Sequence, residues 1–205
     1  ASTHLAPGLR AGFASVRASS ALGDRTLVGG DAAWSPRPGL EFAAEYAASS
    51  ADTHDDAVRA AAQTALGASG AARLYYREVG AGFENPSGPS LAEIGTRRFG
   101  ADARLRLGLG RLAVDASAIQ DLQRGTSRRV LLLDYARELR GWSGSCGYRL
   151  TDAHDPSDAR TAQLLALRAR RQVHARLGLE AGYQQALGEA IDAYPTRLAV
   201  GADVG

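Results

Sequence analysis

The stretch that decides the fold reads Phe99-Gly100-Ala101-Asp102-Ala103-Arg104-Leu105-Arg106-Leu107-Gly108-Leu109. Every second residue is hydrophobic, and the residues between them are charged or glycine. This period of two is typical of a β-strand, whose successive side chains point to opposite faces of a sheet. The stretch is about twice as long as a usual globular strand and matches the roughly 9–11 residues that cross a bilayer at a tilt. The pattern therefore predicts a long strand with one hydrophobic and one charged face.

The same alternation predicts eleven further strands, twelve in all. It is clear at 40–46, 142–151, 173–184 and 197–204, and weaker at about 5–18, 26–35, 57–67, 71–82, 111–121, 128–139 and 160–170. The segments at 57–66 and 159–171 are rich in Ala, Leu, Arg and Gln, which favour helices. We nevertheless assign both to strands, because helices there would break the alternation of connection lengths.

Short and long connections alternate along the chain. The short ones are predicted at Pro36–Gly39, Gly67–Gly70, Leu109-Gly110, Arg140-Gly141 and near Arg171, and the long ones at Ser49–Asp56, Phe83–Gly95, Gln123–Ser127, Asp152–Asp158 and Leu187–Pro195. This alternation indicates an up-and-down sheet whose two ends face different environments. A β-sandwich with Greek-key topology would mix its connections instead.

Composition narrows the class of protein. The 205 residues suit one domain, and the longest aliphatic run, Val130–Leu133, is far shorter than the roughly 18 residues of a transmembrane helix. A net charge of +2 without a basic block argues against nucleic acid as a partner. The single cysteine, Cys146, excludes an internal disulfide and a thiolate zinc cluster. We interpret it as a small hydrophobic residue on the apolar face.

Two strands and one turn carry a resemblance to a known class of protein: Phe99–Leu109, Val173–Tyr183 and Pro36–Gly39. Aromatic residues near strand ends add to it: Trp34, Tyr46, Tyr135, Trp142 and Tyr148. Together they resemble a bacterial outer-membrane β-barrel. The segment Tyr75–Phe83, with Gly95–Arg98 after its loop, is similar to barrel portions of large repeat-bearing surface proteins.

The resemblance implies an all-β, antiparallel, up-and-down transmembrane barrel of about twelve strands in the bacterial outer membrane. Residues 1–205 would form a single barrel domain. Membrane lipid, lipopolysaccharide and small polar solutes would be its partners, and a homo-oligomer or a larger surface assembly stays open. Barrels of this kind usually end in a strand with a terminal aromatic residue, whereas this chain ends Ala202-Asp203-Val204-Gly205 and has no Met. We therefore expect a segment of a longer polypeptide.

The charged face supplies the candidate functional residues. In a barrel it would face the lumen, where charged side chains tune which solutes pass. The predicted pore-lining residues are Arg98, Asp102, Arg104, Arg106, Asp115, Arg149, Arg176, Glu180, Arg197 and Asp203, with Glu41 and Glu45 beside them. The same charges could instead pair across strands and fill a narrow lumen. A twelve-strand barrel is wider than the roughly eight-strand case that side chains fill, which favours a hydrated lumen.

Catalysis, metals and cofactors find little support in the sequence. His174 with Glu180 and Asp203 could be drawn as acid–base partners, and Ser143 or Ser145 as a nucleophile, but no nucleophile-elbow pattern is present. Carboxylates gather at 52–56 and 152–158 without the spacing or central Gly of a calcium loop. We interpret these segments as solvated loops, and we predict no enzyme activity, no cofactor and no metal site.

Three functions remain open at this point. The first is a porin-like passive channel for small polar or charged solutes. The second is the membrane anchor of a larger surface protein, whose lumen holds a linker. The third is a soluble all-β ligand-binding protein, in which Trp34, Tyr46, Trp142, Tyr148 and Tyr183 would pack in a core rather than form an interfacial girdle.

Overall fold

The computed structural model describes residues 2–20, 23–50, 54–83, 93–174, 177–187 and 196–204. They form one all-β antiparallel sheet in which strand order equals chain order. The strands are β1 (Ser2–Ala6), β2 (Leu9–Ser20), β3 (Gly23–Arg37), β4 (Leu40–Ser50), β5 (His54–Ala65), β6 (Gly70–Val79), β7 (Thr96–Leu107), β8 (Gly110–Asp121), β9 (Ser127–Leu139), β10 (Trp142–Asp155), β11 (Asp158–His174), β12 (Leu177–Leu187) and β13 (Arg197–Val204), and η1 (Gly67–Ser69) is a single 3₁₀ turn. The predicted up-and-down topology is confirmed.

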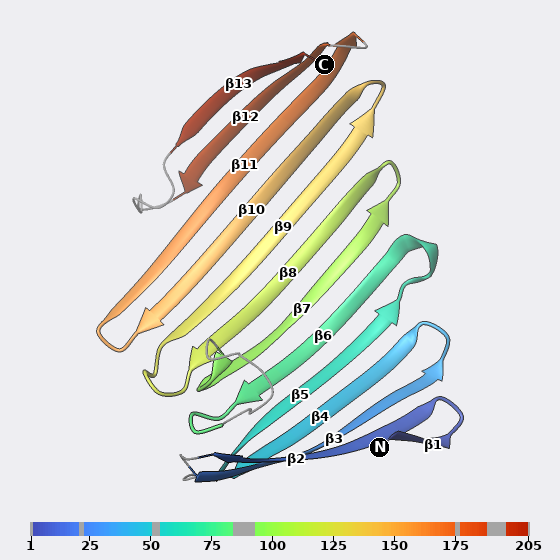
Figure 1. The fold of residues 1–205 in the computed structure, drawn as a ribbon. Helices are drawn as coiled ribbons and strands as arrows, with labels where there is room; N and C mark the ends of the chain where they lie inside the picture. The colour runs from blue at the N-terminus through green and yellow to red at the C-terminus, as the bar shows by residue number, and fades with distance from the viewer. Residues whose placement is uncertain are drawn as a thin grey trace.

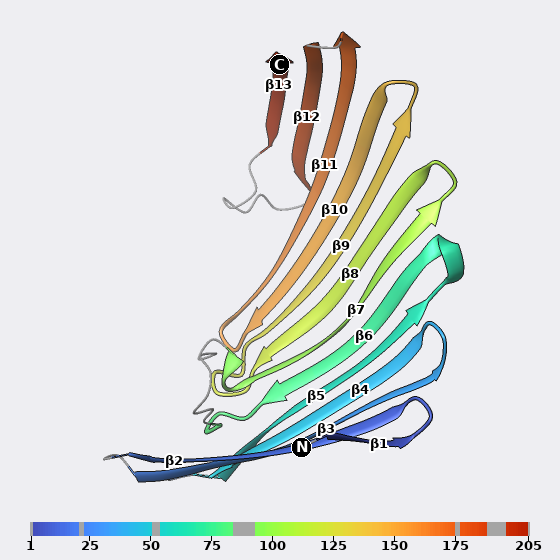
Figure 2. The same cartoon turned by 45° about the vertical axis from the view of Figure 1, so that its right-hand side comes forward.

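The sheet is curved and open in this structure, so the up-and-down sheet of the prediction is present without its closure into a barrel. Figures 1 and 2 show a wall of tilted strands with β1 and β13 at opposite ends. Within the described residues, β1 has only β2 as a neighbour and β13 has only β12. Alternation along each strand predicts the pairing of neighbours, but it contains no information about whether the first and last strands meet.

The sheet has thirteen strands rather than twelve. The predicted strand at 5–18 is divided into β1 and β2 by the turn at Pro7-Gly8, because proline has no N–H to donate and Gly8 adopts a φ of 72°. The predicted strand at 173–184 also starts too early. Val173 and His174 belong to β11, whose 17 residues carry it past the turn predicted near Arg171.

The two segments with helix-forming composition are strands, as predicted. Residues 57–65 lie in β5, and residues 158–174 form β11. Ala57 pairs with Val79, and Leu165 pairs with Tyr148 and Gln185. Tertiary pairing with two neighbours therefore overrides local propensity, which amounts to only a few tenths of a kcal/mol per residue for such amino acids.

The two ends of the sheet differ, and we call them the turn end and the loop end. The turn end includes the tight connections at 7–8, 38–39, 108–109 and 140–141. Arg140 and Gly141 both have positive φ, 47° and 82°, as a two-residue hairpin of type I′ requires. The loop end includes residues 80–83, 93–95 and 122–126, but the connection predicted at Asp152–Asp158 is only the turn Pro156-Ser157, because β10 continues to Asp155.

Gly70 begins β6 at the turn end with a φ of 147°. A Cβ atom there would lie 1.9 Å from the carbonyl oxygen of Arg104 on β7. Glycine therefore allows β6 and β7 to approach each other at this point. No helix in the described part of the chain is long and apolar enough to cross a membrane.

Candidate functional site on the polar face of the sheet

The register of the strands divides the sheet into two chemically distinct faces. Residues paired across neighbouring antiparallel strands point to the same face, so each pairing carries the assignment from strand to strand. Phe99 pairs with Tyr76 and Ala118, whereas Asp102 pairs with Arg73 and Asp115. We call the side that carries Phe99 the apolar face and the side that carries Asp102 the polar face.

The predicted pore-lining residues that the structure describes share the polar face. Those placed there by register are Arg98, Asp102, Arg104, Arg106, Asp115, Arg149, Glu180 and Arg197, together with Glu41 and Glu45. The backbone of Asp203 pairs with Gly178, and Arg176 lies outside the described residues. The alternation of the sequence thus predicts which of these described residues share a face, whereas their pore-lining role stays a prediction.

The apolar face exposes large hydrophobic side chains. Twenty described ones are exposed, and sixteen of these lie on this face; the other four are Val16 on the polar face and Leu66, Leu109 and Leu122 in connections. Exposed fractions reach 60% for Leu74, 75% for Leu198 and 79% for Val200. An apolar surface that extends over most of a sheet is far larger than monomeric soluble proteins usually show.

The described residues form no conventional hydrophobic core. Among them, the buried hydrophobic residues are Val79, Phe83 and Ala162, and no side chain is less than 2% exposed. The sheet is a single layer, and no second layer of the described chain covers its apolar side (Figure 2). The predicted position of Cys146 on the apolar face is confirmed by its pairing with Tyr135 and Leu167, and its side chain is exposed.

Charged residues border the apolar face at the loop end. Arg97 donates two hydrogen bonds to Glu78, Nε to Oε2 at 2.9 Å and Nη2 to Oε1 at 3.0 Å, and the hydroxyl of Tyr76 donates to the same carboxylate. Arg129 and Asp152 continue this border on β9 and β10. On β7, the apolar stretch from Phe99 to Leu107 spans roughly 27 Å of strand.

Aromatic residues on the apolar face lie toward both ends. Trp34 stacks on Phe42 at a centroid distance of 5.6 Å near the turn end. Trp142 begins β10 at the same end, where the guanidinium of Arg171 lies 5.0 Å from its ring. Tyr46 lies toward the loop end of β4, whereas Tyr148 and Tyr183 are farther from the ends. Of the predicted girdle residues, the two tryptophans therefore lie nearest to an end of the sheet.

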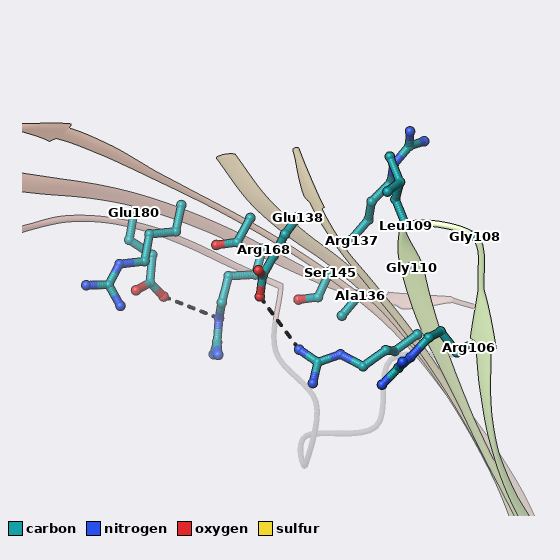
Figure 3. Close-up of a pocket in the computed structure, with 14 residues that line it drawn as sticks. Arg106, Gly108, Leu109, Gly110, Ala136, Arg137, Glu138, Ser145, Arg168 and Glu180 are labelled. Atoms are coloured by element: carbon teal, nitrogen blue, oxygen red, sulfur yellow. Dashed lines mark ion pairs between the residues drawn. The ribbon is translucent and has the colours of Figure 1, made fainter. Parts of the chain in front are cut away.

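A group of charged residues on the polar face forms the candidate site, which we call the basic cluster. It consists of Arg106, Arg111, Arg168 and Arg170 with Glu138, Glu180, Ser143 and Ser145, which line a concavity of about 520 Å³ toward the turn end. Figure 3 shows Arg106, Arg168 and Glu180 on the inner side of the arch that the sheet forms. Alternation predicted that Arg106 and Glu180 lie on the polar face. It did not predict that Arg111, Arg168 and Arg170 line the same concavity.

Two ion pairs lie within the basic cluster. Arg168 Nε is 3.3 Å from Glu180 Oε1, and Arg111 Nη2 is 3.6 Å from Glu138 Oε1. All four side chains are at least 47% exposed, and exposed pairs of this kind contribute only about 0–1 kcal/mol. No ion pair joins Arg106 to another described residue. These two ion pairs of the basic cluster are therefore exposed and weak.

Among the acid–base partners considered from the sequence whose side chains are described, the structure brings neither Ser143 nor Glu180 close to His174, since both are opposite Arg170. Ser143 pairs with Arg170, and His174 lies four residues further along β11, about 13 Å away. The carboxylate of Glu180 forms an ion pair with Arg168 instead. Within the described ranges, no three His, Cys, Asp or Glu side chains are placed to hold a metal ion.

The connection after β6 is held against the polar face at the loop end. The carboxylate of Asp55 accepts hydrogen bonds from the backbone N–H groups of Gly82, at 2.6 Å, and Asp56, at 2.8 Å. Gly80 donates to the carbonyl of Asp56 at 2.8 Å. Phe83 is buried here, as are Ser49 and Val79 on the polar face. The start of this loop is therefore packed onto the sheet.

No family model matches the chain, and no curated protein matches it. Its class therefore rests on the sheet, its two faces and the chemistry of the polar face.

We expect the Asp55→Ala substitution to release the start of this loop, because Gly82 N–H loses its charged acceptor. With Phe83→Cys as a reporter and Cys146→Ser to remove the native thiol, labelling by a water-soluble maleimide should accelerate about tenfold or more, as the loss of a charge-assisted hydrogen bond of roughly 1.5–3 kcal/mol implies. Asp56→Ala is the matched control, since its side chain makes no such contact with Gly82. Equal rates in the two variants would show that Asp55 does not anchor the loop.

Proposed function

We propose that this chain forms the wall of a β-barrel in a bacterial outer membrane and works as a porin-like passive channel for small polar or charged solutes. The exposed apolar face is the observation that supports this proposal most strongly. Covering one large hydrophobic side chain contributes about 1.5–3 kcal/mol, so sixteen partly exposed ones amount to on the order of 10–20 kcal/mol. Hydrocarbon supplies this cover without a second layer of protein.

The opposite face supports a water-filled interior. The polar face carries many arginines and carboxylates, and several of its positions are glycine or alanine, among them Ala136 and Gly182. Removing so many charges from water into a dry core would cost several kcal/mol per ion. Water on the concave side avoids this cost and leaves the charges free to act on passing solutes.

The asymmetry of the two ends supports the choice of membrane. Outer-membrane barrels have short turns on the periplasmic side and longer loops outside. The turn end would then face the periplasm, and the loop end would face lipopolysaccharide and the exterior. The charged border formed by Glu78, Arg97, Arg129 and Asp152 would lie at the outer headgroup region.

A barrel in lipid needs its two edges paired, since a free strand edge leaves backbone groups without partners in hydrocarbon. All neighbouring strands are antiparallel, so β1 and β13 run in the same direction and cannot pair in an antiparallel way. β2 runs opposite to β13, and pairing of these two strands gives an antiparallel barrel of twelve strands. β1 reaches only Leu9 to Gly12 of β2 and would have to leave that edge.

Cysteine pairs test this closure in a Cys146→Ser background. We expect Ala14→Cys on β2 to form a disulfide with Ala199→Cys or Gly201→Cys on β13 in the membrane-inserted protein, because these positions share the polar face. Thr3→Cys with Ala202→Cys is the control for a β1–β13 seam. A gel under non-reducing conditions separates bonds within one chain from bonds between two chains. Failure of both β2–β13 pairs, with success of the control, would contradict the proposed closure.

Spin labels at Leu105 and Arg104 test which face meets lipid. In liposomes, we expect the label at Leu105 to be accessible to oxygen and the label at Arg104 to an aqueous relaxation agent, because these neighbours point to opposite faces of β7. Leu133 and Asp134 provide a second pair on β9. If both labels of each pair report the same surroundings, lipid does not cover the apolar face; a protein that stays in solution without detergent would lead to the same conclusion.

Conductance distinguishes a channel from a membrane anchor. Reconstituted in a planar bilayer, the full chain should give discrete current steps of uniform size, because a passage lined by the polar face conducts ions. A heat-denatured sample is the control for leakage through damaged lipid. Insertion into the bilayer without steps would contradict the channel and support a plugged anchor.

A further inference from the structure

Two neighbouring rows of residues carry the basic cluster across the sheet. One row runs perpendicular to the strands through Arg106 on β7, Arg111 on β8, Ala136 on β9, Ser145 on β10 and Arg168 on β11. The next row toward the turn end runs through Glu138, Ser143, Arg170 and Glu180. Neighbouring strands lie about 4.8 Å apart, so the first row extends over roughly 19 Å.

The cluster has an excess of positive charge. Its four arginines outnumber its two glutamates, so the cluster as defined has a formal excess of two positive charges. Arg104 and Arg197 lie in the adjacent row toward the loop end, with Asp134 between them. Because the sheet is concave on this side, the guanidinium groups act on a shared volume of water (Figure 3).

Small residues between the arginines leave this volume open. Ala136 separates Arg111 from Ser145 along the first row, and Gly182 follows Arg168. The hydroxyl groups of Ser143 and Ser145 add neutral donors between the charged strands. The site therefore has room for a small ligand, with hydrogen-bond donors on several sides of it.

The internal ion pairs are weak enough to yield to such a ligand. The Arg111–Glu138 distance of 3.6 Å exceeds a normal hydrogen bond, and the two side chains are 74% and 77% exposed. Arg106 and Arg111 are directly opposite each other, so their like charges repel unless an anion lies between them. A guanidinium binds an oxyanion through two parallel N–H groups, which a compact ammonium cannot do.

We propose that the basic cluster binds small oxyanions of the phosphate class and makes the passage selective for anions. This inference rests on the proposed channel, because the polar face must line the passage for the cluster to act on moving solutes. Lipid headgroups are excluded as the source of the phosphate, since they would contact the apolar face. The ligand is therefore a free solute that enters the lumen.

Ion selectivity of the wild-type chain in a planar bilayer is the first test. Under a tenfold gradient of KCl, the reversal potential should show that chloride passes more readily than potassium, because rings of positive side chains concentrate anions in a pore. Inorganic phosphate added to the chloride solution should reduce the chloride current as it occupies the cluster. A potassium-selective current would overturn the inference and leave the proposed channel standing.

Arg106→Glu is the decisive variant, and Arg129→Glu is its matched control. Both change the charge by the same amount, but Arg106 lies in the cluster whereas Arg129 lies on the apolar face. Arg106→Glu should lower the chloride-to-potassium permeability ratio by about threefold or more and weaken the phosphate block, as reversal of a charge in a pore ring does. Arg129→Glu should leave both close to wild type. Equal effects of the two variants would overturn the inference.

Binding without conductance separates the two proposals. Equilibrium dialysis of detergent-solubilised protein against radiolabelled inorganic phosphate measures phosphate binding to the cluster directly. The Arg106→Lys variant is the control for folding, because it keeps the positive charge. A protein that gives no current but binds phosphate in an Arg106-dependent way would contradict the channel and support the site. Absence of binding to wild-type protein would overturn the site whether or not the chain conducts.

Discussion

Backbone hydrogen bonding between neighbouring strands holds this protein together. In most domains a packed core fixes the arrangement of the elements, but here the described side chains enclose almost no buried volume. Each interior strand instead satisfies its backbone groups with two neighbours, and the pairing is continuous from β2 to β12. Both faces follow from that pairing, because antiparallel register places residues of like polarity side by side. Any change of register by one residue would transfer arginines to the leucine side.

Period-two alternation could predict most of this architecture. It predicts the all-β structure, the order of the strands and the shared face of charged residues such as Asp102, Arg104 and Arg149. The assignment at 57–66 depended on a regularity of the whole chain, since local composition favoured a helix. This success has a physical reason: a single-layered sheet with one apolar and one polar face leaves a strong periodic signal, whereas a strand buried on both faces does not.

Three features were beyond the reach of alternation. The break at Pro7-Gly8 is local and leaves the alternation on both sides intact, so alternation predicts one strand at 5–18 where the structure has the end of β1 and most of β2. The length of β11 depends on its two neighbours: Trp142 of β10 pairs with Arg171, and Leu177 of β12 pairs with His174. The basic cluster depends on register across six strands, from Arg106 on β7 to Glu180 on β12, and no single stretch of sequence encodes it. Closure of the sheet likewise depends on contacts between the two ends of the chain.

Strand order that equals chain order has a consequence for how such a wall is assembled and modified. Each new hairpin needs only the edge of the preceding one, so its loop-closure entropy stays small and the sheet can grow by sequential zipping. Gain or loss of one complete hairpin would change the width of the sheet by two strands and leave every remaining side chain on its original face. The width of the molecule is therefore a modular property, separable from the chemistry of either surface.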